Sequence, residues 1–407
     1  MLKGDGHMKW QTPGSQFSPI KDILYEQYRQ RKIYIYGAGQ FGTRMAKALK
    51  AVTDWPVMAF VDRYKAGTEY LGLPVISMAE MEKIIKEEKE RVLLLLSLRG
   101  KNEKELLQKF KQMLSGTSHL YKRYDEFMRH DFPIIAYYQY GKTVVHSLSC
   151  IVTERCTLKC EKCAICLPFF KYKNEYSKEK IKEEIDLAFE KIDFISDVTF
   201  TGGEPLLNKD LEEILRYISE KYRDRMGSCR IITNGTLTPS EGLLNCMSQN
   251  HIYAEISDYT KNVKEIEQKV LSNYEKFCAA GVHTYLLSDN QWIDFGFKKV
   301  IHQEESEEEM IHFFDECETI CRGYIDGKIW YCINARFAEQ ALGMEYDSNN
   351  MFDLRRMGDE EKEKIKLVEF DIGYNERGYL TMCRYCNGGY TNNTHYIEVG
   401  KQWNRDS

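Results

Sequence analysis

Short apolar runs alternate with amphipathic stretches along the first third of the chain. The predicted elements are strand Lys32–Tyr36, a helix through Met45, Ala46 and Leu49, strand Val57–Val61, helix Met78–Glu90 and strand Val92–Leu98. Buried strands separated by helices are typical of a parallel sheet with helices packed on its faces. Residues 1–130 are therefore predicted to form a small, doubly wound, Rossmann-like α/β domain.

A second series of strands and helices follows between residues 145 and 300. Its predicted elements are strand Ser147–Val152, helix Ser177–Ile192, strand Val198–Thr201, a helix through Leu211 and Ile218 capped by Asn208, strand Arg230–Thr233, strand Ile252–Ser257, helix Val263–Ala280 and strand His283–Leu287. Right-handed crossovers curl such a series into a parallel barrel. We predict a partial (β/α)6 TIM barrel over residues 131–300 and a cysteine-rich module over residues 301–407.

The first predicted strand runs into a glycine motif. Gly37, Gly39 and Gly42 follow it and open a helix, and Asp62 ends the next strand. This order is typical of dinucleotide-binding turns, in which backbone amides approach a pyrophosphate and the acid bonds a ribose. The sequence therefore predicts a nucleotide or nucleotide-sugar site, with a glycine turn that binds nothing as the alternative.

Composition narrows the class of protein. Of 407 residues, 43% are hydrophobic and 29% charged, and the net charge of −5 comes with no long basic run, which gives no footprint for nucleic acid. The chain shows no signal peptide and no apolar run long enough for a bilayer, so we expect a cytoplasmic protein without membrane contact. In that setting thirteen cysteines indicate metal binding or catalysis.

Three of those cysteines lie within eight residues, directly after a predicted strand. Cys156, Cys160 and Cys163 have C-x3-C-x2-C spacing. One short loop with this spacing can bind three corners of an iron–sulfur cubane and leave the fourth iron open. A zinc site with Cys166 as fourth thiolate is the alternative.

This loop resembles that of the radical S-adenosylmethionine superfamily. Further likenesses follow at successive strand ends, in Gly202-Gly203-Glu204-Pro205, Thr233-Asn234 and Ser257-Asp258. The resemblance implies a 4Fe–4S cluster on the three cysteines, S-adenosylmethionine bound to its open iron, and contacts of the three motifs to that cofactor. Lys162 departs from the family, which usually has an aromatic or apolar residue before the third cysteine. Cys166 has no place in the motif and is either a buried structural thiol or a thiol near the substrate.

A second group of cysteines lies near the C-terminus: Cys317, Cys321, Cys332, Cys383 and Cys386. A hairpin is predicted around Asp326-Gly327, and its register pairs Cys321 with Cys332. The group resembles the SPASM and "twitch" modules, which implies an auxiliary 4Fe–4S cluster with five candidates for four places. Zinc is the alternative. The remaining cysteines are expected to be core thiols: Cys150, Cys229, Cys246 and Cys278.

The resemblance implies an enzyme that forms a 5′-deoxyadenosyl radical and takes hydrogen from a substrate, with electrons from a reductant such as flavodoxin or ferredoxin. We expect oxidation, epimerisation or related remodelling of a sugar, nucleotide-linked because of the N-terminal glycine motif. Tyr259, Trp292 and Asp294 are candidates to contact it. The alternatives are a SPASM-type enzyme that modifies a peptide, and a metal-stabilised binding protein without activity.

Overall fold

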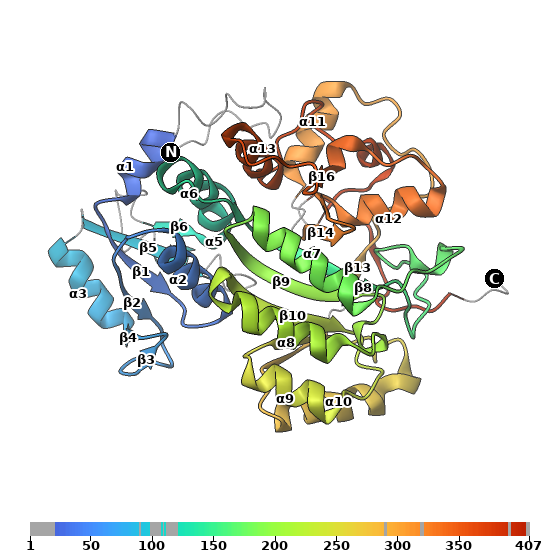
Figure 1. The fold of residues 1–407 in the computed structure, drawn as a ribbon, viewed down its shortest axis with the longest axis horizontal. Helices are drawn as coiled ribbons and strands as arrows, with labels where there is room; N and C mark the ends of the chain where they lie inside the picture. Colours follow the sequence, from blue (N-terminus) through green and yellow to red (C-terminus); the bar gives the residue numbers. More distant parts are fainter. Residues whose placement is uncertain are drawn as a thin grey trace.

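The computed structural model describes residues 21–88, 91–97, 107–108, 110, 121–288, 291–317, 321–389 and 392–403. The N-terminal part of the chain lies beside a larger barrel-like sheet, and the C-terminal part covers one end of that sheet (Figure 1). No helix of the described residues is long and apolar enough to span a membrane.

The N-terminal domain is built on a six-stranded sheet with the order β3-β4-β2-β1-β5-β6. Its strands are β1 (Lys32–Tyr36), β2 (Val57–Val61), β3 (Glu69–Tyr70), β4 (Leu73–Ile76), β5 (Val92–Leu96) and β6 (Tyr121–Arg123). Alternate residues of β1 enter different cores: Ile33 and Ile35 pack with Met45 of α2, whereas Tyr34 packs with Met81 of α3. Helices on both faces make this the predicted doubly wound arrangement.

The helices of this part are α1 (Lys21–Tyr28), α2 (Gln40–Val52), α3 (Met78–Glu88), α5 (Tyr124–Glu126), the π-helical turn η3 (Phe127–Asp131) and α6 (Phe132–Tyr140). The predicted helix 78–90 is confirmed as far as Glu88, and residues 89, 90 and 98 of the predicted elements lie outside the described residues. The first two predicted strands have the bounds that the sequence indicated.

The second sheet has nine strands, in the order β12-β11-β10-β9-β8-β14-β15-β16, with β7 paired to β9. The strands are β7 (Val144–Val145), β8 (Leu148–Thr153), β9 (Phe194–Gly202), β10 (Met226–Thr233), β11 (Tyr253–Ser257), β12 (Thr284–Leu287), β14 (Gly323–Ile325), β15 (Lys328–Trp330) and β16 (Met351–Asp353). Strands β8 to β12 are parallel, and β14 joins β8 in parallel. The C-terminal hairpin therefore extends the barrel sheet across the boundary predicted at residue 300.

Amphipathic helices cover the outer face of this sheet: α7 (Lys178–Lys191), α8 (Leu211–Tyr222), α9 (Glu241–Gln249) and α10 (Glu267–Ala279), with the short turns η4 (Leu167–Phe169), η5 (Pro205–Leu207), η6 (Arg223–Arg225) and η7 (Lys264–Ile266). Ser177 caps α7 by accepting from the Lys180 amide, and Ile181, Ile185 and Phe189 face the core. The prediction that Asn208 caps α8 is wrong. Its amide group donates to the Val152 carbonyl instead, which ties the strand before the cysteine loop to the next crossover.

The C-terminal part adds α11 (Glu307–Glu316), α12 (Ile333–Leu342), α13 (Glu361–Ile372), the turns η8 (Ser348–Asn350) and η9 (Thr381–Tyr385), and a small sheet of β13 (Trp292–Ile293) and β17 (Tyr396–Ile397). β13 pairs with β17 and not with the nine-stranded sheet. Residues 396–403 are thereby brought back to the barrel mouth.

The N-terminal domain is fixed to the barrel by buried charges. The Arg44 guanidinium of α2 donates to the Asp197 carboxylate at 2.6 Å and to the Ser228 hydroxyl at 2.7 Å. Both partners lie toward the starting ends of β9 and β10. The interface therefore forms at the N-terminal edge of the barrel strands.

Candidate active site

The cysteine loop follows β8 and lies at the C-terminal edge of the barrel strands. A pocket of about 400 Å³ opens beside it. The predicted site residues that line this pocket are Cys156, Cys160, Cys163, Gly202, Gly203, Thr233, Asn234, Ser257, Tyr259 and Trp292. Motifs from four successive strand ends are thus gathered around one cavity.

Gly202 and Gly203, at the end of β9, hold the cysteine loop in place. The Gly203 amide donates to the Thr153 carbonyl at 2.9 Å. A Cβ on Gly203 would lie 2.1 Å from the Arg155 carbonyl oxygen and 2.9 Å from the Cys156 Cβ. Any larger residue would push the loop away, so glycine is required for the approach of two backbone segments.

Glu204 holds two strand ends together in the structure, and its contact to the cofactor stays a prediction. Its side chain is fully buried and does not line the pocket. The carboxylate accepts from the Thr233 hydroxyl at 2.7 Å and from the amides of Asn234 and Leu206. Burial raises its pKa, and these donors oppose the rise. Glu204 therefore fixes the end of β10 against β9, and Pro205 starts the buried turn beside it.

The loop after β10 contacts the cysteine loop directly. The Asn234 side-chain amide donates to the Thr157 hydroxyl at 3.0 Å and lies 3.6 Å from the Cys156 sulfur. A hydrogen bond between the hydroxyls of Thr157 and Thr236 at 2.6 Å closes the same contact. Thr233 and Asn234 thus line the pocket, with Asn234 beside the first cysteine, and their contact to the cofactor stays a prediction.

The residues after β11 separate into two roles. Ser257 lines the pocket, but the Asp258 carboxylate points elsewhere and accepts from the Thr260 amide and the Ser288 hydroxyl. Asp258 therefore stabilises the loop after β11, and its contact to the cofactor stays a prediction. Tyr259 packs edge-on against Trp292 at 5.1 Å between ring centroids. Burial raises the Tyr259 pKa, and the nearby cysteine loop raises it further.

The C-terminal segment of the chain covers the cysteine loop, which the sequence did not indicate. Cys160 forms an antiparallel bridge with Gln402, whose side-chain amide lies 3.5 Å from the Cys160 sulfur. The Lys159 amide donates to the Gln402 side chain at 2.8 Å, and the Glu161 amide donates to the Lys401 carbonyl. Residues 400–403 thus close one wall of the site.

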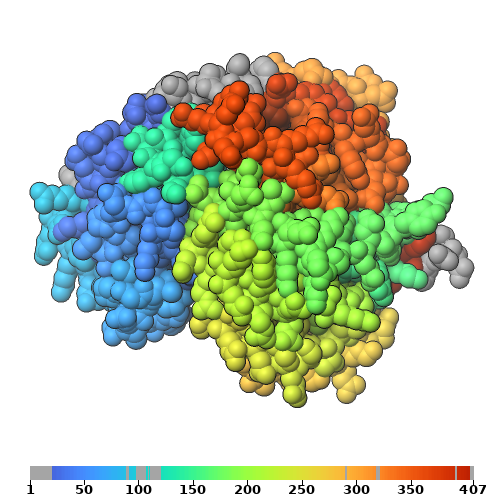
Figure 2. Space-filling view, in the orientation of Figure 1, coloured from blue at the N-terminus to red at the C-terminus, as the bar shows by residue number. Residues whose placement is uncertain are grey.

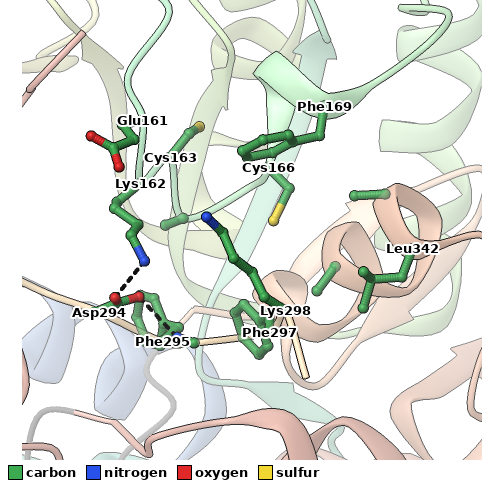
Figure 3. A pocket seen from close by; sticks show the side chains of 14 residues that line it. Glu161, Lys162, Cys163, Cys166, Phe169, Asp294, Phe295, Phe297, Lys298 and Leu342 are labelled. Carbon is green, nitrogen blue, oxygen red and sulfur yellow. Dashed lines mark hydrogen bonds and ion pairs between the residues drawn. The ribbon is translucent and has the colours of Figure 1, made fainter. Parts of the chain in front are cut away.

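Lys162 pairs with Asp294 at 2.5 Å, with 26% and 21% of their side chains exposed. Lys162 also lines a neighbouring pocket of about 150 Å³, whose walls include Phe169, Phe297 and Leu342 (Figure 3). Burial raises the Asp294 pKa, but the Lys162 ammonium outweighs this and holds it below its ordinary value. The charged pair therefore lies between two chambers of the site: the larger, more polar pocket and the smaller, more apolar pocket.

The three loop thiols suit a metal cluster. Burial raises the pKa of Cys156 to about 11 and that of Cys160 to about 12, and each thiolate would raise the pKa of the others. Such thiols ionise only when a positive charge compensates them, and coordination to metal supplies that charge. Cys166 is buried, and its sulfur lies toward the smaller pocket (Figure 3).

A second group of thiols assembles from three separate segments. Cys317 ends α11, Cys332 precedes α12, and Cys383 and Cys386 belong to η9 and its end. Burial raises the pKa of Cys383, and the proximity of Cys317 and Cys332 raises it further; Cys386 is affected by the same neighbours. Four of the five predicted C-terminal ligands are therefore close together.

Cys321 does not join this group, which corrects the prediction of the hairpin pair. The register is as predicted, with Gly323 opposite Trp330, but the ladder ends there. Burial raises the Cys321 pKa, and its charged neighbours are Arg230, Asp197, Arg129 and Glu255 rather than other cysteines. The Cys321 thiol therefore lies near charged residues of β9, β10 and β11.

A site for a single metal ion is absent from the described residues. The described residues contain no group of three or more His, Cys, Asp or Glu side chains arranged for one metal ion. A cubane binds each cysteine through a different iron, so its ligands are spread further apart than those of zinc. The scattered thiols Cys150, Cys229 and Cys246 are buried as expected, whereas Cys278 is exposed.

The N-terminal glycine motif is mainly structural. A Cβ on Gly42 would lie 2.0 Å from the Gly37 carbonyl oxygen, and Gly37 has a φ of +102° beside the Ser97 hydroxyl. The Asp62 carboxylate accepts from the amides of Ala38, Tyr64 and Lys65, so both oxygens already stabilise the loop. Gly39 differs, because an added Cβ would meet no atom within 4 Å.

Comparison with known proteins identifies the central part of the chain. Residues 150–290 match the Radical SAM superfamily, and this range contains the cysteine loop and all three strand-end motifs. These residues form a radical SAM domain. The superfamily uses a 4Fe–4S cluster and S-adenosylmethionine.

Curated relatives share parts of this chain. A probable GTP 3′,8-cyclase of Archaeoglobus fulgidus is 32% identical over 159 residues, 35% of this chain and 48% of that protein. Fe-coproporphyrin III synthase of Methanosarcina barkeri is 40% identical over 91 residues, 22% of this chain and 21% of that protein. The chain thus spans less than half the length of either relative.

Two solved structures are also similar. BtrN in complex with AdoMet and 2-DOIA has a TM-score of 0.37 at 14% identity, over 64% of this chain and 98% of that one. SuiB of Streptococcus suis bound to S-adenosylmethionine has a TM-score of 0.31 at 15% identity, over 61% and 51%.

Proposed function

We propose that the whole chain is a radical SAM enzyme that cleaves S-adenosylmethionine and removes hydrogen from a small substrate. The observation that carries this proposal is the gathering of Cys156, Cys160 and Cys163 with three strand-end motifs around one pocket. The cluster and S-adenosylmethionine, when bound, supply a 5′-deoxyadenosyl radical. The residues of the chain would position the cluster and the cofactor and would limit the access of water to them.

Individual residues have separate tasks in this proposal. Asn234 and Thr157 support the first cysteine from the side, and Gln402 covers the second. Ser257 offers a hydroxyl to the polar part of the cofactor. Tyr259 forms an aromatic wall beside the loop and limits access of water.

The second thiol group is proposed to hold an auxiliary 4Fe–4S cluster through Cys317, Cys332, Cys383 and Cys386. Its position beside the substrate pocket supports this role. The Asn387 amide donates to the Phe295 carbonyl at 2.9 Å, and Phe295 lines both chambers. A cluster here would lie one loop away from the substrate and could accept an electron from it.

The substrate is proposed to be sugar-like, and the reaction oxidation, epimerisation or a related change. Polar groups at the mouth and interior of the larger pocket support a hydroxyl-rich ligand: Lys162, Thr201, Glu255 and Gln291 all line it. The nucleotide link loses its support, because the glycine loop meets the barrel at the opposite edge of the sheet.

One observation favours peptide modification as a second candidate. The smaller chamber is lined by Phe169, Phe297 and Leu342, together with alanines of α12, and would suit an apolar side chain. A sugar makes no use of such a surface. The two candidates therefore differ in which chamber the substrate fills.

The test is anaerobic incubation of reconstituted protein with S-adenosylmethionine and a low-potential reductant such as reduced flavodoxin or ferredoxin. We expect 5′-deoxyadenosine and methionine to form slowly alone and faster with substrate. Stimulation by sugars or nucleotide-sugars supports the first candidate, and stimulation by peptides supports the second. Absence of 5′-deoxyadenosine from protein that contains its clusters would contradict the proposal.

A further inference from the structure

The N-terminal domain and the barrel meet across a second, separate pocket of about 310 Å³. Figure 2 shows the two parts, blue and yellow-green, meeting along a notch at the lower edge of the molecule. The domain side contributes Gly39, Gln40, Lys65 and Tyr70, and the barrel side Met247, Ser248, His251, Ile252, Tyr253, Gly281, His283 and Tyr285. Neither part forms the pocket alone.

This interdomain pocket lies away from the proposed chemistry. Residues 247–252 lead into β11, and residues 281–283 lead into β12. They mark the N-terminal edge of the parallel strands, whereas the cysteine loop and Ser257 follow their C-terminal ends. A ligand here would be separated from the radical SAM cluster by the length of the barrel.

The pocket is suited to an anion. Its lining includes Lys65, His251 and His283, and none of the described residues that line it is acidic. Asp62, the nearest acid of the glycine motif, is occupied by backbone amides and does not line the pocket. The charge of a bound anion would therefore meet basic groups and no carboxylate.

The same pocket presents aromatic rings. His283 packs edge-on against Tyr253 at 5.2 Å and against Tyr285 at 4.8 Å between centroids. Tyr285 lies in β12 and keeps 37% of its surface exposed. On the side of the N-terminal domain, the Lys65 ammonium lies 4.5 Å from the centroid of the Tyr70 ring. An exposed aromatic surface next to basic groups fits a ligand that combines a flat ring with a phosphate.

We propose that this interdomain pocket binds a nucleoside diphosphate as an effector that joins the two parts of the chain. Lys65 and His251 would contact the phosphates, and Tyr285 with His283 would contact the base. The ligand would act beside the fixed interface of Arg44 and Asp197, without entering the active site. This inference goes beyond the proposed function and does not depend on it.

The test is calorimetric titration of the full, reconstituted chain with UDP, ADP and GDP, and with inorganic phosphate. Gly39→Val is the sharpest variant, because Gly39 has an extended backbone that any residue adopts and an added Cβ would meet nothing within 4 Å. Tyr285→Ala and Lys65→Met test the ring and the charge. Tyr64→Ala and Lys50→Met are matched controls on exposed residues outside the pocket.

We expect at least one diphosphate to bind once per chain with a Kd below about 1 mM. Tyr285→Ala, Lys65→Met and Gly39→Val should each weaken binding at least about tenfold, and the controls should not. No binding of any diphosphate, binding of phosphate as tight as that of the nucleotides, or binding unchanged in the three pocket variants would overturn the proposal. Radical cleavage of S-adenosylmethionine can succeed or fail independently of each result.

Discussion

The two thiol groups of this chain are built in opposite ways. The first lies within eight residues of one loop, between Cys156 and Cys163, and is placed by a glycine pair and a strand end. The second spans seventy residues, from Cys317 to Cys386, and is assembled by two helices and a turn. A local loop can be recognised from spacing alone, whereas a dispersed group is defined only by the fold that brings its members together.

The largest expected effect belongs to the local loop. Cys160→Ala should abolish formation of 5′-deoxyadenosine and reduce the iron content from about eight to about four per chain, because two cubanes become one. Iron analysis and chromatography of the reaction measure both. Cys166→Ala is the matched control, since a four-thiolate zinc site would need this residue and a cluster with an open iron would not. Equal loss of metal in both variants would contradict the assignment.

The second prediction tests which cysteines belong to the dispersed group. Cys383→Ala should also reduce the iron content to about four per chain, while substrate-independent formation of 5′-deoxyadenosine continues, because the first cluster is intact. Cys321→Ala should keep about eight irons, since that thiol lies near Arg230. If Cys321→Ala loses iron and Cys317→Ala does not, the group has been assigned wrongly.

A smaller effect concerns the segment that covers the local loop. Gln402→Ala removes a side chain that contacts both the Lys159 amide and the Cys160 sulfur. Since one such hydrogen bond contributes about 1 kcal/mol, the first cluster should be lost severalfold faster on exposure to a chelator. The second cluster should be lost at its normal rate. Visible absorbance follows each cluster separately, because the Cys383→Ala background contains only the first cluster and the Cys160→Ala background only the second.

The smallest effect concerns the ion pair between the two chambers. Lys162→Met leaves the partly buried Asp294 without its cation and should lower the free energy of unfolding by about 1 kcal/mol at pH 7. The Asp294 pKa lies below its ordinary value in the folded protein, so this contribution is complete above about pH 4 and is lost as pH falls through the folded pKa. Thermal unfolding of both proteins should converge on acidification. Lys159→Met is the control, and a constant difference at every pH would contradict the assignment.

Prediction from the sequence succeeded for local features and failed for contacts between distant segments. Elements with local signals were predicted well: β1 and β2 have the expected bounds, and Ser177 begins α7. Contacts between distant segments were not predictable. Gln402 lies 242 positions from Cys160, and nothing in its neighbourhood indicates a metal site.

The errors have physical reasons. The hairpin register was predicted correctly, but the destination of Cys321 depends on the pairing of β14 with β8, which brings Gly323 opposite Ser149. The three hydrogen bonds that Glu204 accepts at the ends of β9 and β10 were likewise not evident from the sequence, and its contact to the cofactor stays a prediction. In both cases local sequence fixed the backbone, and the packing of other strands decided what the side chain meets.

The central claim is that only the local loop leaves an iron open for S-adenosylmethionine. Electron paramagnetic resonance of the reduced protein, recorded with and without S-adenosylmethionine, tests it most directly. The account predicts that the cofactor alters the signal of one cluster in the unmodified protein and in Cys383→Ala, and has no effect when Cys156, Cys160 and Cys163 are replaced together. A cofactor-sensitive signal that survives this triple replacement, or none in the unmodified protein with both clusters present, would contradict it.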